Sequence, residues 1–161
     1  MTLEDFFLLL KEHPDAYVMI DSKQYSLRNY QRTLEDYCDY VEIARAAGAE
    51  SVLDQIIPEI YSEAMFPGTT MIYSFPSYVY SLWQEYTTEE LNDIAEFCQT
   101  NKIMAVTIYR DYWSEEVQKI FDERDILVYI YTINDKEEAR RYLANGAQGV
   151  CTDVLITDNL N

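Results

Sequence analysis

Short apolar runs alternate with longer segments of helical periodicity along most of this 161-residue chain. A short apolar run that is bounded by capping and turn residues predicts a buried strand. Strands that are separated by helices form a parallel sheet covered by helices. The pattern therefore predicts an α/β fold, with strand signals at 16–21, 51–61, 69–75, 78–83, 103–108, 126–132 and 149–153.

The region around Pro76 is the least regular part of this pattern. Both 69–75 and 78–83 have the composition of a strand, and we expect one to be a regular strand and the other an excursion at the rim. The regular strands then number six. A doubly wound sheet can stop at six strands, whereas a (β/α)8 barrel needs eight to close. Pro58 lacks an N–H, so it should end the pairing of its strand or lie at the strand's mouth.

Capping residues mark where the helices begin. A side chain that accepts a hydrogen bond from the first turn satisfies one of the N–H groups that a helix leaves without a partner. Gly residues mark helix ends, because glycine tolerates the left-handed backbone that follows a helix. We expect helices over 3–12 after Thr2, 29–47 before Gly48, 87–100 with a Thr87–Glu90 capping box, 114–124 after Ser114, and 135–146 with an Asp135–Glu138 box and Gly146.

Composition narrows the class of protein. Hydrophobic residues make up 48% of the chain, which argues for a folded core, and nothing marks an internal boundary, so we expect a single domain over 1–161. The net charge of −17 repels nucleic acid and anionic membranes. No segment has the length and hydrophobicity of a membrane span, and the residues before the first apolar run are acidic rather than basic. We therefore expect a cytoplasmic protein, unless an N-terminal segment has been removed.

Motifs for nucleotides and metals are scarce. The sequence contains neither GxGxxG nor GxxxxGK[ST], which excludes the simplest dinucleotide and nucleotide loops. Cys38, Cys98 and Cys151 are far apart, and we expect buried thiols rather than a metal site or disulfides. The one histidine, His13, lies in a turn before Pro14 and is expected at the surface.

The segment "VYIYTINDKEEARRYLANGAQGVCTD" resembles the C-terminal signature of glycerophosphodiester phosphodiesterases. In that family an aromatic-Thr-x-Asn motif at a strand end leads into a helix, and Gly-x-x-Gly-hydrophobic-x-Thr-Asp closes the barrel. Glycine suits the turn into the last strand, and Asn or Asp can start a helix. Earlier segments also fit, except 62–86. The matching residues are Tyr131, Thr132, Ile133, Asn134, Gly146, Gly149, Val150, Cys151, Thr152 and Asp153.

The resemblance implies a TIM (β/α)8-barrel-like fold that is incomplete, with about six βα units and without the first two strands. Two strands at its ends would then expose unpaired edges. Such a chain can be a piece of a longer protein, a homo-oligomer that associates through its open strand edges, or a tightened irregular barrel. The sequence does not choose among these three.

The resemblance also implies metal-assisted acid–base hydrolysis of a phosphodiester, with Mg²⁺ or Ca²⁺ as the cofactor. The family's His-Arg-Gly and His-Asp motifs are absent here, and Asp21-Ser22-Lys23 stands at its Glu-x-Lys position. Asp21 and Glu59 are the candidate metal ligands, Lys23 the candidate phosphate partner, and Trp83 and Tyr131 a candidate lip for the alcohol. The alternatives are a strand-end ion pair for Asp21 and Lys23, a solvated Glu59, and core packing for the two aromatic residues.

We therefore expect a glycerophosphodiester phosphodiesterase-like domain. Its intact relative would hydrolyse a glycerophosphodiester to an alcohol and glycerol phosphate, and this chain alone would be inactive because it lacks both catalytic histidines. The alternative is a non-catalytic remnant that acts as a binding or interaction module. An unrelated α/β phosphate-binding protein is the third reading, but it predicts a glycine-rich anion loop that the sequence does not contain.

Overall fold

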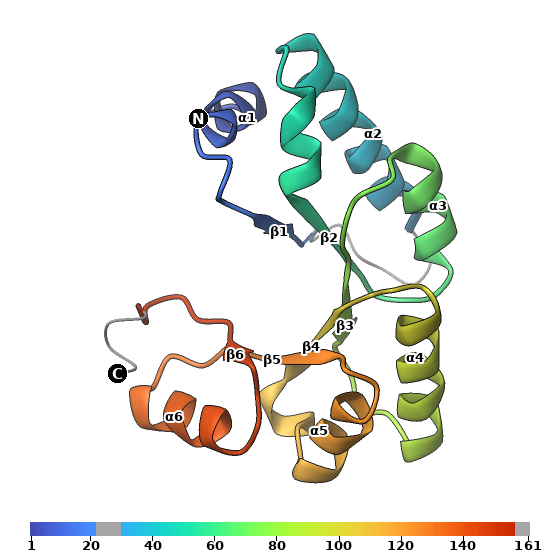
Figure 1. The fold of residues 1–161 in the computed structure, drawn as a ribbon, viewed down its shortest axis with the longest axis vertical. Coiled ribbons are helices and arrows are strands. Elements are labelled where there is room, and N and C mark those ends of the chain that lie inside the picture. The colour runs from blue at the N-terminus through green and yellow to red at the C-terminus, as the bar shows by residue number, and fades with distance from the viewer. Residues whose placement is uncertain (22–29, 157–161) are drawn as a thin grey trace. The chain divides into compact units, whose positions relative to one another are not determined.

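A computed structural model describes residues 1–21 and 30–156. The chain divides into two compact units, Met1–Tyr78 and Val79–Asn161. Helices and strands alternate in both units (Figure 1).

The first unit has a two-stranded parallel pair. Strand β1 (Val18–Ile20) lies beside β2 (Ile56–Ile60), with Val18 opposite Ile56 and Ile20 opposite Pro58. Three helices accompany the pair (Figure 1), and a 3₁₀ helix leads directly into β2. These are α1 (Leu3–Lys11), α2 (Tyr30–Ala46), α3 (Met65–Ile72) and the 3₁₀ helix Glu50–Gln55.

Buried aromatic and aliphatic side chains hold this unit together. Phe7 of α1 and Tyr37 of α2 are fully buried, and each packs edge-on against the ring of Tyr40. The amide of Gln55 donates to the carbonyls of His13 at 2.7 Å and Ala16 at 2.8 Å, which fixes the turn before β1. The amino ends of β1 and β2 are therefore tied together.

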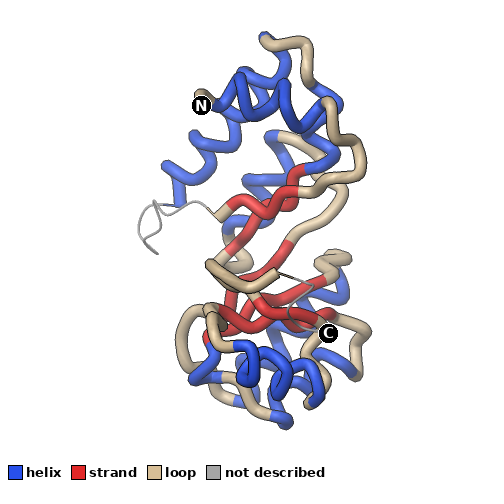
Figure 2. Tube along the Cα trace, turned by 90° about the vertical axis from the view of Figure 1, so that its left-hand side faces the viewer, coloured by secondary structure: helices blue, strands red, loops and turns tan. Residues whose placement is uncertain are grey.

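The second unit is a four-stranded parallel sheet in which each strand pairs with the next one along the chain. Helices cover one face of this sheet (Figure 1), and strands and helices form separate layers in the turned view (Figure 2). The strands are β3 (Val79–Leu82), β4 (Ala105–Tyr109), β5 (Leu127–Tyr131) and β6 (Gly149–Val150); the helices are α4 (Thr88–Thr100), α5 (Glu115–Asp122) and α6 (Lys136–Ala144), with a 3₁₀ turn over Arg110–Tyr112.

The capping residues lie where the sequence places them. Thr2 and Thr87 each form a full capping box, and Ser114 and Asp135 accept from the N–H of the third helical residue. Gly48 and Gly146 follow helices with φ of +65° and +104°, in the left-handed region. The predicted caps and glycine ends are confirmed, and of the predicted Asp135–Glu138 box the bond from the Glu138 N–H to Asp135 is present.

Residues of the C-terminal signature are joined to one another by side-chain hydrogen bonds. The side-chain oxygen of Asn134 accepts from the Thr152 hydroxyl at 3.0 Å and from the Asp153 N–H at 2.9 Å, while its amide donates to the Asp153 carboxylate at 3.1 Å. The segment after β6 is thereby held to the segment after β5. Gly149 has a different role from the expected tight turn: a Cβ there would lie 2.6 Å from the Tyr129 ring, directly opposite on β5.

Only one of the two candidate strands, 69–75 and 78–83, is a strand, as expected, but 69–75 is not an excursion at the rim, because α3 occupies Met65–Ile72. The hydroxyls of Thr69 and Thr70 donate to the carbonyls one turn earlier, at 2.9 and 3.0 Å, which lets these β-branched residues fit a helix. The strand predicted at 78–83 is confirmed as β3. Pro58 does end the pairing with β1, but β2 continues beyond it to Ile60.

Two predictions about single residues have different outcomes. His13 is exposed, as expected. Of the cysteines, Cys98 is buried and Cys151 half-buried, but Cys38 is exposed on α2, so the expectation of a buried thiol is wrong there. Among residues 1–21 and 30–156, no helix is both long and apolar enough to cross a membrane.

Candidate functional site

The carboxyl ends of β1 and β2 bring Asp21 and Glu59 together. Ile20 lies opposite Pro58, so the next residue on each strand is one of these two acids. Asp21 is half-buried, and Glu59 is only 5% exposed. The sequence therefore correctly placed two carboxylates at one edge, but the interpretation of Glu59 as a solvated side chain is wrong.

Two tyrosines complete this strand-end cluster. The Tyr61 hydroxyl donates a hydrogen bond to Oδ1 of Asp21. The Tyr37 hydroxyl donates to the Ile20 carbonyl at 3.4 Å. Burial raises the pKa of Tyr37 well above its usual value, and the nearby Tyr40, Glu59 and Asp21 raise it further. Tyr37 therefore keeps its proton throughout the physiological pH range.

The cluster does not fit a divalent cation as it stands. Mg²⁺ and Ca²⁺ prefer several oxygen ligands, and two carboxylates would be a reasonable start. However, one oxygen of Asp21 already accepts from Tyr61. Within the described ranges, no group of three or more His, Cys, Asp or Glu side chains could hold a metal ion. Asp21 and Glu59 therefore do not form the ligand set of a divalent-metal site with the other described residues.

The His13 imidazole lies at the amino end of β1, whereas Asp21 lies at its carboxyl end. His13 precedes β1, and Gln55, which precedes β2, donates to its carbonyl at 2.7 Å. Asp21 follows β1. The chain's only histidine is therefore at the amino end of the pair, whereas the carboxylates are at the carboxyl end.

In the second unit, Trp83 follows β3, and Tyr131 is the last residue of β5. Both side chains are half-buried. The Tyr131 hydroxyl donates to the Leu82 carbonyl at 3.5 Å, and its ring lies 5.8 Å from that of Tyr109. These contacts join the end of β5 to the ends of β3 and β4, which favours a packing role for Tyr131. Lys23, the expected phosphate partner, lies outside the described residues.

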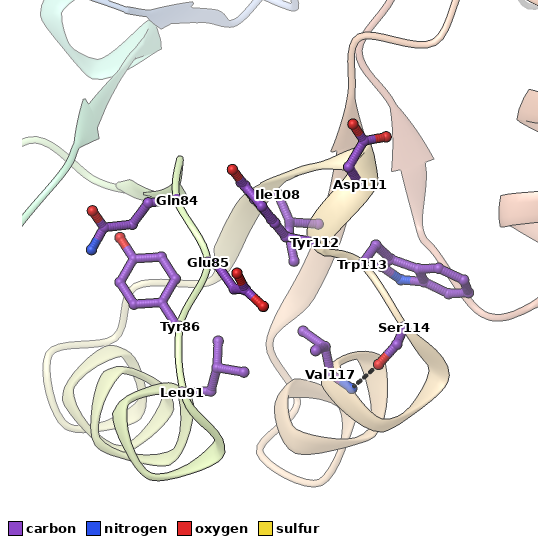
Figure 3. Close-up of a pocket in the computed structure, with 10 residues that line it drawn as sticks. All are labelled: Gln84, Glu85, Tyr86, Leu91, Ile108, Asp111, Tyr112, Trp113, Ser114 and Val117. Carbon is purple, nitrogen blue, oxygen red and sulfur yellow. Dashed lines mark hydrogen bonds between the residues drawn. The ribbon is translucent and has the colours of Figure 1, made fainter.

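A hollow of about 270 Å³ opens beside the ends of β3 and β4. Figure 3 shows the carboxylate of Glu85 directed inward, with Leu91 and Val117 on the helix side, whereas the Trp113 ring is directed away from Glu85. Trp113 instead donates to Gln118 at 3.1 Å and packs edge-on against Tyr142. The lining residues are Gln84, Glu85, Tyr86, Leu91, Ile108, Asp111, Tyr112, Trp113, Ser114 and Val117.

Sequence reasoning missed this hollow, although a signal was present. The loop after β3 reads "WQEYTTEE" and the loop after β4 reads "YRDYWSEE", so each has an acid beside an aromatic residue just before a helix cap. Carboxylates and tyrosine rings over an apolar floor can attract a small organic cation. Asp111 is engaged in part, because Arg110 lies 3.7 Å from it.

Comparison with known proteins identifies the fold. No protein-family model and no curated protein matches the chain. A solved structure from Silicibacter pomeroyi, named as a glycerophosphoryl diester phosphodiesterase, is similar with a TM-score of 0.69 at 15% identity over 93% of this chain. A glycerophosphodiester phosphodiesterase from Parabacteroides distasonis is similar with a TM-score of 0.62 at 9% identity over 94%.

The class of fold follows from these neighbours. The chain spans 52% and 59% of the lengths of the two solved structures. It therefore has the fold of part of a glycerophosphodiester phosphodiesterase domain. The predicted fold class, an incomplete (β/α)8-barrel-like α/β fold, and the family resemblance noted in the C-terminal signature are confirmed at the level of the fold.

Proposed function

We propose that this chain is a glycerophosphodiester phosphodiesterase-like domain that does not hydrolyse a phosphodiester by itself. The intact relative would convert a glycerophosphodiester to an alcohol and glycerol phosphate. The fold shared with two proteins of that name supports the substrate class. The proposal also includes two expectations from the sequence. Residues 1–161 form a single domain, and the protein is cytoplasmic.

The position of His13 is the observation that carries the proposal. A general acid or base must lie within hydrogen-bond reach of the proton that it transfers. His13 is exposed at the amino end of β1, while Asp21 and Glu59 lie at the carboxyl end. An imidazole there cannot act on a substrate that the carboxylates contact.

The tyrosines near the carboxylates do not replace the imidazole. A base must be deprotonated at working pH, and the raised pKa keeps Tyr37 protonated. Tyr61 already donates its proton to Asp21 in a hydrogen bond. Among the described residues of the cluster, neither Tyr37 nor Tyr61 is therefore suited to accept a proton and then donate it near neutral pH.

We assign Lys23 to the substrate's phosphate and Trp83 to its alcohol, whereas the contacts of Tyr131 with Leu82 and Tyr109 favour packing over the alcohol role that the sequence suggested for it. Asp21 and Glu59 remain the residues that would meet a Mg²⁺ or Ca²⁺ ion in an intact relative. In this chain the Tyr61 hydrogen bond argues against that role for Asp21. These assignments are proposals that rest on the resemblance and on the strand ends.

The test is an assay of glycerophosphocholine with the purified chain in the presence of Mg²⁺ or Ca²⁺. We expect choline release, followed by ³¹P NMR of the phosphorus products, to stay at the level of buffer alone. An Asp21→Ala variant purified in parallel reveals any contaminating hydrolase, because a contaminant would be equally active in both preparations. Turnover that survives repurification and is lost in Asp21→Ala would falsify the proposal.

A second candidate function, an interaction module, is favoured by exposed apolar side chains of the first unit. Leu8 and Leu9 of α1 and Met19 of β1 are 42%, 47% and 40% exposed. Interaction surfaces commonly present exposed apolar side chains. If the partner is a second copy of this chain, the protein should sediment as a dimer or larger oligomer at high salt, where its net charge of −17 is screened. The Met19→Lys variant should sediment as a monomer under the same conditions.

A further inference from the structure

We propose that Asn145 is a site of spontaneous chemical modification, at which the main-chain nitrogen of Gly146 displaces the side-chain amide nitrogen of Asn145 as ammonia. The product is an aspartate or an isoaspartate in the turn that leads from α6 to β6. The inference concerns the second unit alone. It does not depend on whether the chain hydrolyses a phosphodiester.

The reaction needs only water and hydroxide. The Gly146 nitrogen loses its proton to hydroxide and bonds to Cγ of Asn145, while the bond from Cγ to Nδ2 breaks and the leaving nitrogen takes a proton from water. Water then opens the five-membered imide at one of its two carbonyls. Opening at Cγ leaves an aspartate, whereas opening at the main-chain carbonyl leaves an isoaspartate, in which the main chain runs through Cβ. A following glycine favours the first step, because it has no side chain to crowd the attacking nitrogen.

The structure leaves the reacting groups accessible. Asn145 is the C-cap of α6, and both Asn145 and Gly146 are exposed. The Gly146 N–H donates to the Leu143 carbonyl at 3.3 Å, a long hydrogen bond in a helix end, where fraying is common. Over the described ranges 1–21 and 30–156, no residue hydrogen-bonds to the side-chain amide of Asn145. Opening of one weak hydrogen bond therefore frees the nitrogen beside an untethered amide.

Helix α4 ends in the same way and provides an internal comparison. Its C-cap is Asn101, with φ of −96° and ψ of 7°, against −97° and 16° for Asn145. Lys102 follows it in the left-handed region, as Gly146 follows Asn145. The Lys102 N–H also donates to a carbonyl three residues earlier at 3.3 Å, the same distance as for Gly146. The two helix ends therefore open by breaking equivalent backbone hydrogen bonds.

Two differences between these helix ends favour reaction at Asn145. The side-chain amide of Asn101 donates to the Phe97 carbonyl at 2.9 Å, so it is held against its own helix. The residue after Asn101 is a lysine, whereas the residue after Asn145 is a glycine. An untethered amide can turn toward the following nitrogen, and the glycine leaves that nitrogen uncrowded. The structure therefore separates a reactive asparagine from a protected one at matched positions.

The modification changes a turn on which the last strand depends. The Gly146 carbonyl accepts from the side-chain amides of Gln118 at 3.1 Å and Gln148 at 2.8 Å. The side-chain oxygen of Gln148 in turn accepts from the N–H of Val128 on β5 at 2.6 Å. An isoaspartate adds a carbon atom to the main chain directly before this carbonyl and displaces it from its partners. We therefore expect the connection between α6 and β6 to loosen.

The test is incubation of the purified chain at pH 8.5 and 37 °C. Peptide mass spectrometry gives the rate at each asparagine, and methyl transfer by a protein isoaspartyl methyltransferase detects the isoaspartate. We expect Asn145 to convert about tenfold faster than Asn101 in the same molecule, because only the next residue and the amide hydrogen bond differ. Asn145→Gln should abolish methyl acceptance at this turn, since the longer side chain would have to close a six-membered ring. Conversion at Asn145 that is no faster than at Asn101 overturns the inference.

Lys102→Gly tests the two differences separately. It creates an Asn-Gly pair at the end of α4 and leaves the hydrogen bond from Asn101 to Phe97 in place. We expect conversion at Asn101 to become faster but to stay slower than at Asn145. An unchanged rate at Asn101 contradicts the role of the glycine. A rate equal to that of Asn145 contradicts the role of the amide hydrogen bond.

Urea unfolding of fresh and incubated protein tests the effect on the fold. Trp113 donates to Gln118, which donates to the Gly146 carbonyl, so tryptophan fluorescence reports on this turn. The urea midpoint should fall in incubated wild type but not in incubated Asn145→Gln, and fresh Asn145→Gln should unfold at the wild-type midpoint. An unchanged midpoint after conversion at Asn145 is complete contradicts the proposed loosening. None of these readouts uses the phosphodiester assay, so this test and that of the proposed function fail independently.

Discussion

The strand ends of the two units use the same residue types in opposite ways. In Met1–Tyr78, Asp21 and Glu59 are partly or wholly buried, and a tyrosine hydroxyl meets the aspartate. In Val79–Asn161, Glu85 and Asp111 are exposed on either side of an open hollow. Burial decides the difference: a buried carboxylate must be satisfied by the protein, whereas an exposed one is satisfied by water and remains available to a ligand.

The two units can be followed separately in solution. Both tryptophans of the chain, Trp83 and Trp113, belong to the second unit. Tryptophan fluorescence therefore reports unfolding of Val79–Asn161, while amide hydrogen exchange reports both units residue by residue. This permits substitutions that test the comparison one unit at a time.

Gly149→Ala should have the largest effect. Its Cβ would lie 2.6 Å from the Tyr129 ring, so the β5–β6 pair must shift. We expect the second unit to lose about 2 kcal/mol of stability, as overpacked sites typically do. The measurement is urea unfolding followed by tryptophan fluorescence.

A matched pair of controls separates crowding from backbone strain. Gly48→Ala places a Cβ where no atom lies within 4 Å, at a φ of +65°, so only left-handed strain remains. It lies in the first unit and should leave the tryptophan transition in place. Tyr129→Leu combined with Gly149→Ala should recover much of the loss. An unshifted midpoint in Gly149→Ala would show that the ring moves aside at little cost.

Glu85→Gln should have an intermediate effect, on binding rather than on stability. We expect tetramethylammonium to bind weakly in the hollow and its affinity to fall about fivefold when this carboxylate is neutralised, as for an exposed cation site with aromatic walls. Chemical shifts of the amides of 84–91 and 111–117 provide the measurement. Glu96→Gln, an exposed acid on α4 away from the hollow, is the control. Equal weakening by both variants would mean that only the overall charge matters.

The capping boxes should give the smallest effect, one in each unit. Hydrogen bonds from Thr2 lower the pKa of Asp5, and those from Thr87 lower the pKa of Glu90. A lowered pKa in the folded state means that the stabilisation is present above the ordinary pKa of the acid and is lost as the pH falls through the lowered value. Glu90→Gln should flatten the acid side of the stability profile of α4, and Asp5→Asn that of α1. Hydrogen exchange between pH 6 and pH 3 checks each helix, and an unchanged profile in both variants would contradict the role of the boxes.

Much of the fold could be predicted because local chemistry determines it. Thr87 and Ser114 begin helices, and Gly146 ends one, through contacts within a single turn. Helix α3 could not be predicted in this way. Its threonines favour a strand in isolation, but Thr69 is fully buried and Gly68 faces Leu34 of α2 closely enough to favour helix packing. Tertiary contacts therefore override the local preference.

Part of the candidate site could also be predicted from the sequence, and part could not. Asp21 and Glu59 were predicted at one edge, because residues that follow neighbouring parallel strands meet there. Tyr61 was not, because the reach of a long side chain across to another strand leaves no pattern in the sequence. Glu85 and Asp111 look like ordinary solvated charges in the sequence, and only the two similar loops that carry them give a hint.

The pairing of each strand with its successor in Val79–Asn161 has a consequence for how that unit acquires its structure. Val79 meets Ala105, Ala105 meets Leu127, and Tyr129 meets Gly149, so each new pairing spans a single helix. Each pairing therefore closes a loop of similar length, and the entropy cost of loop closure rises only slowly with loop length. Assembly can therefore proceed one strand–helix step at a time. A chain that spans about half of its structural neighbours can in this way still form a covered parallel sheet.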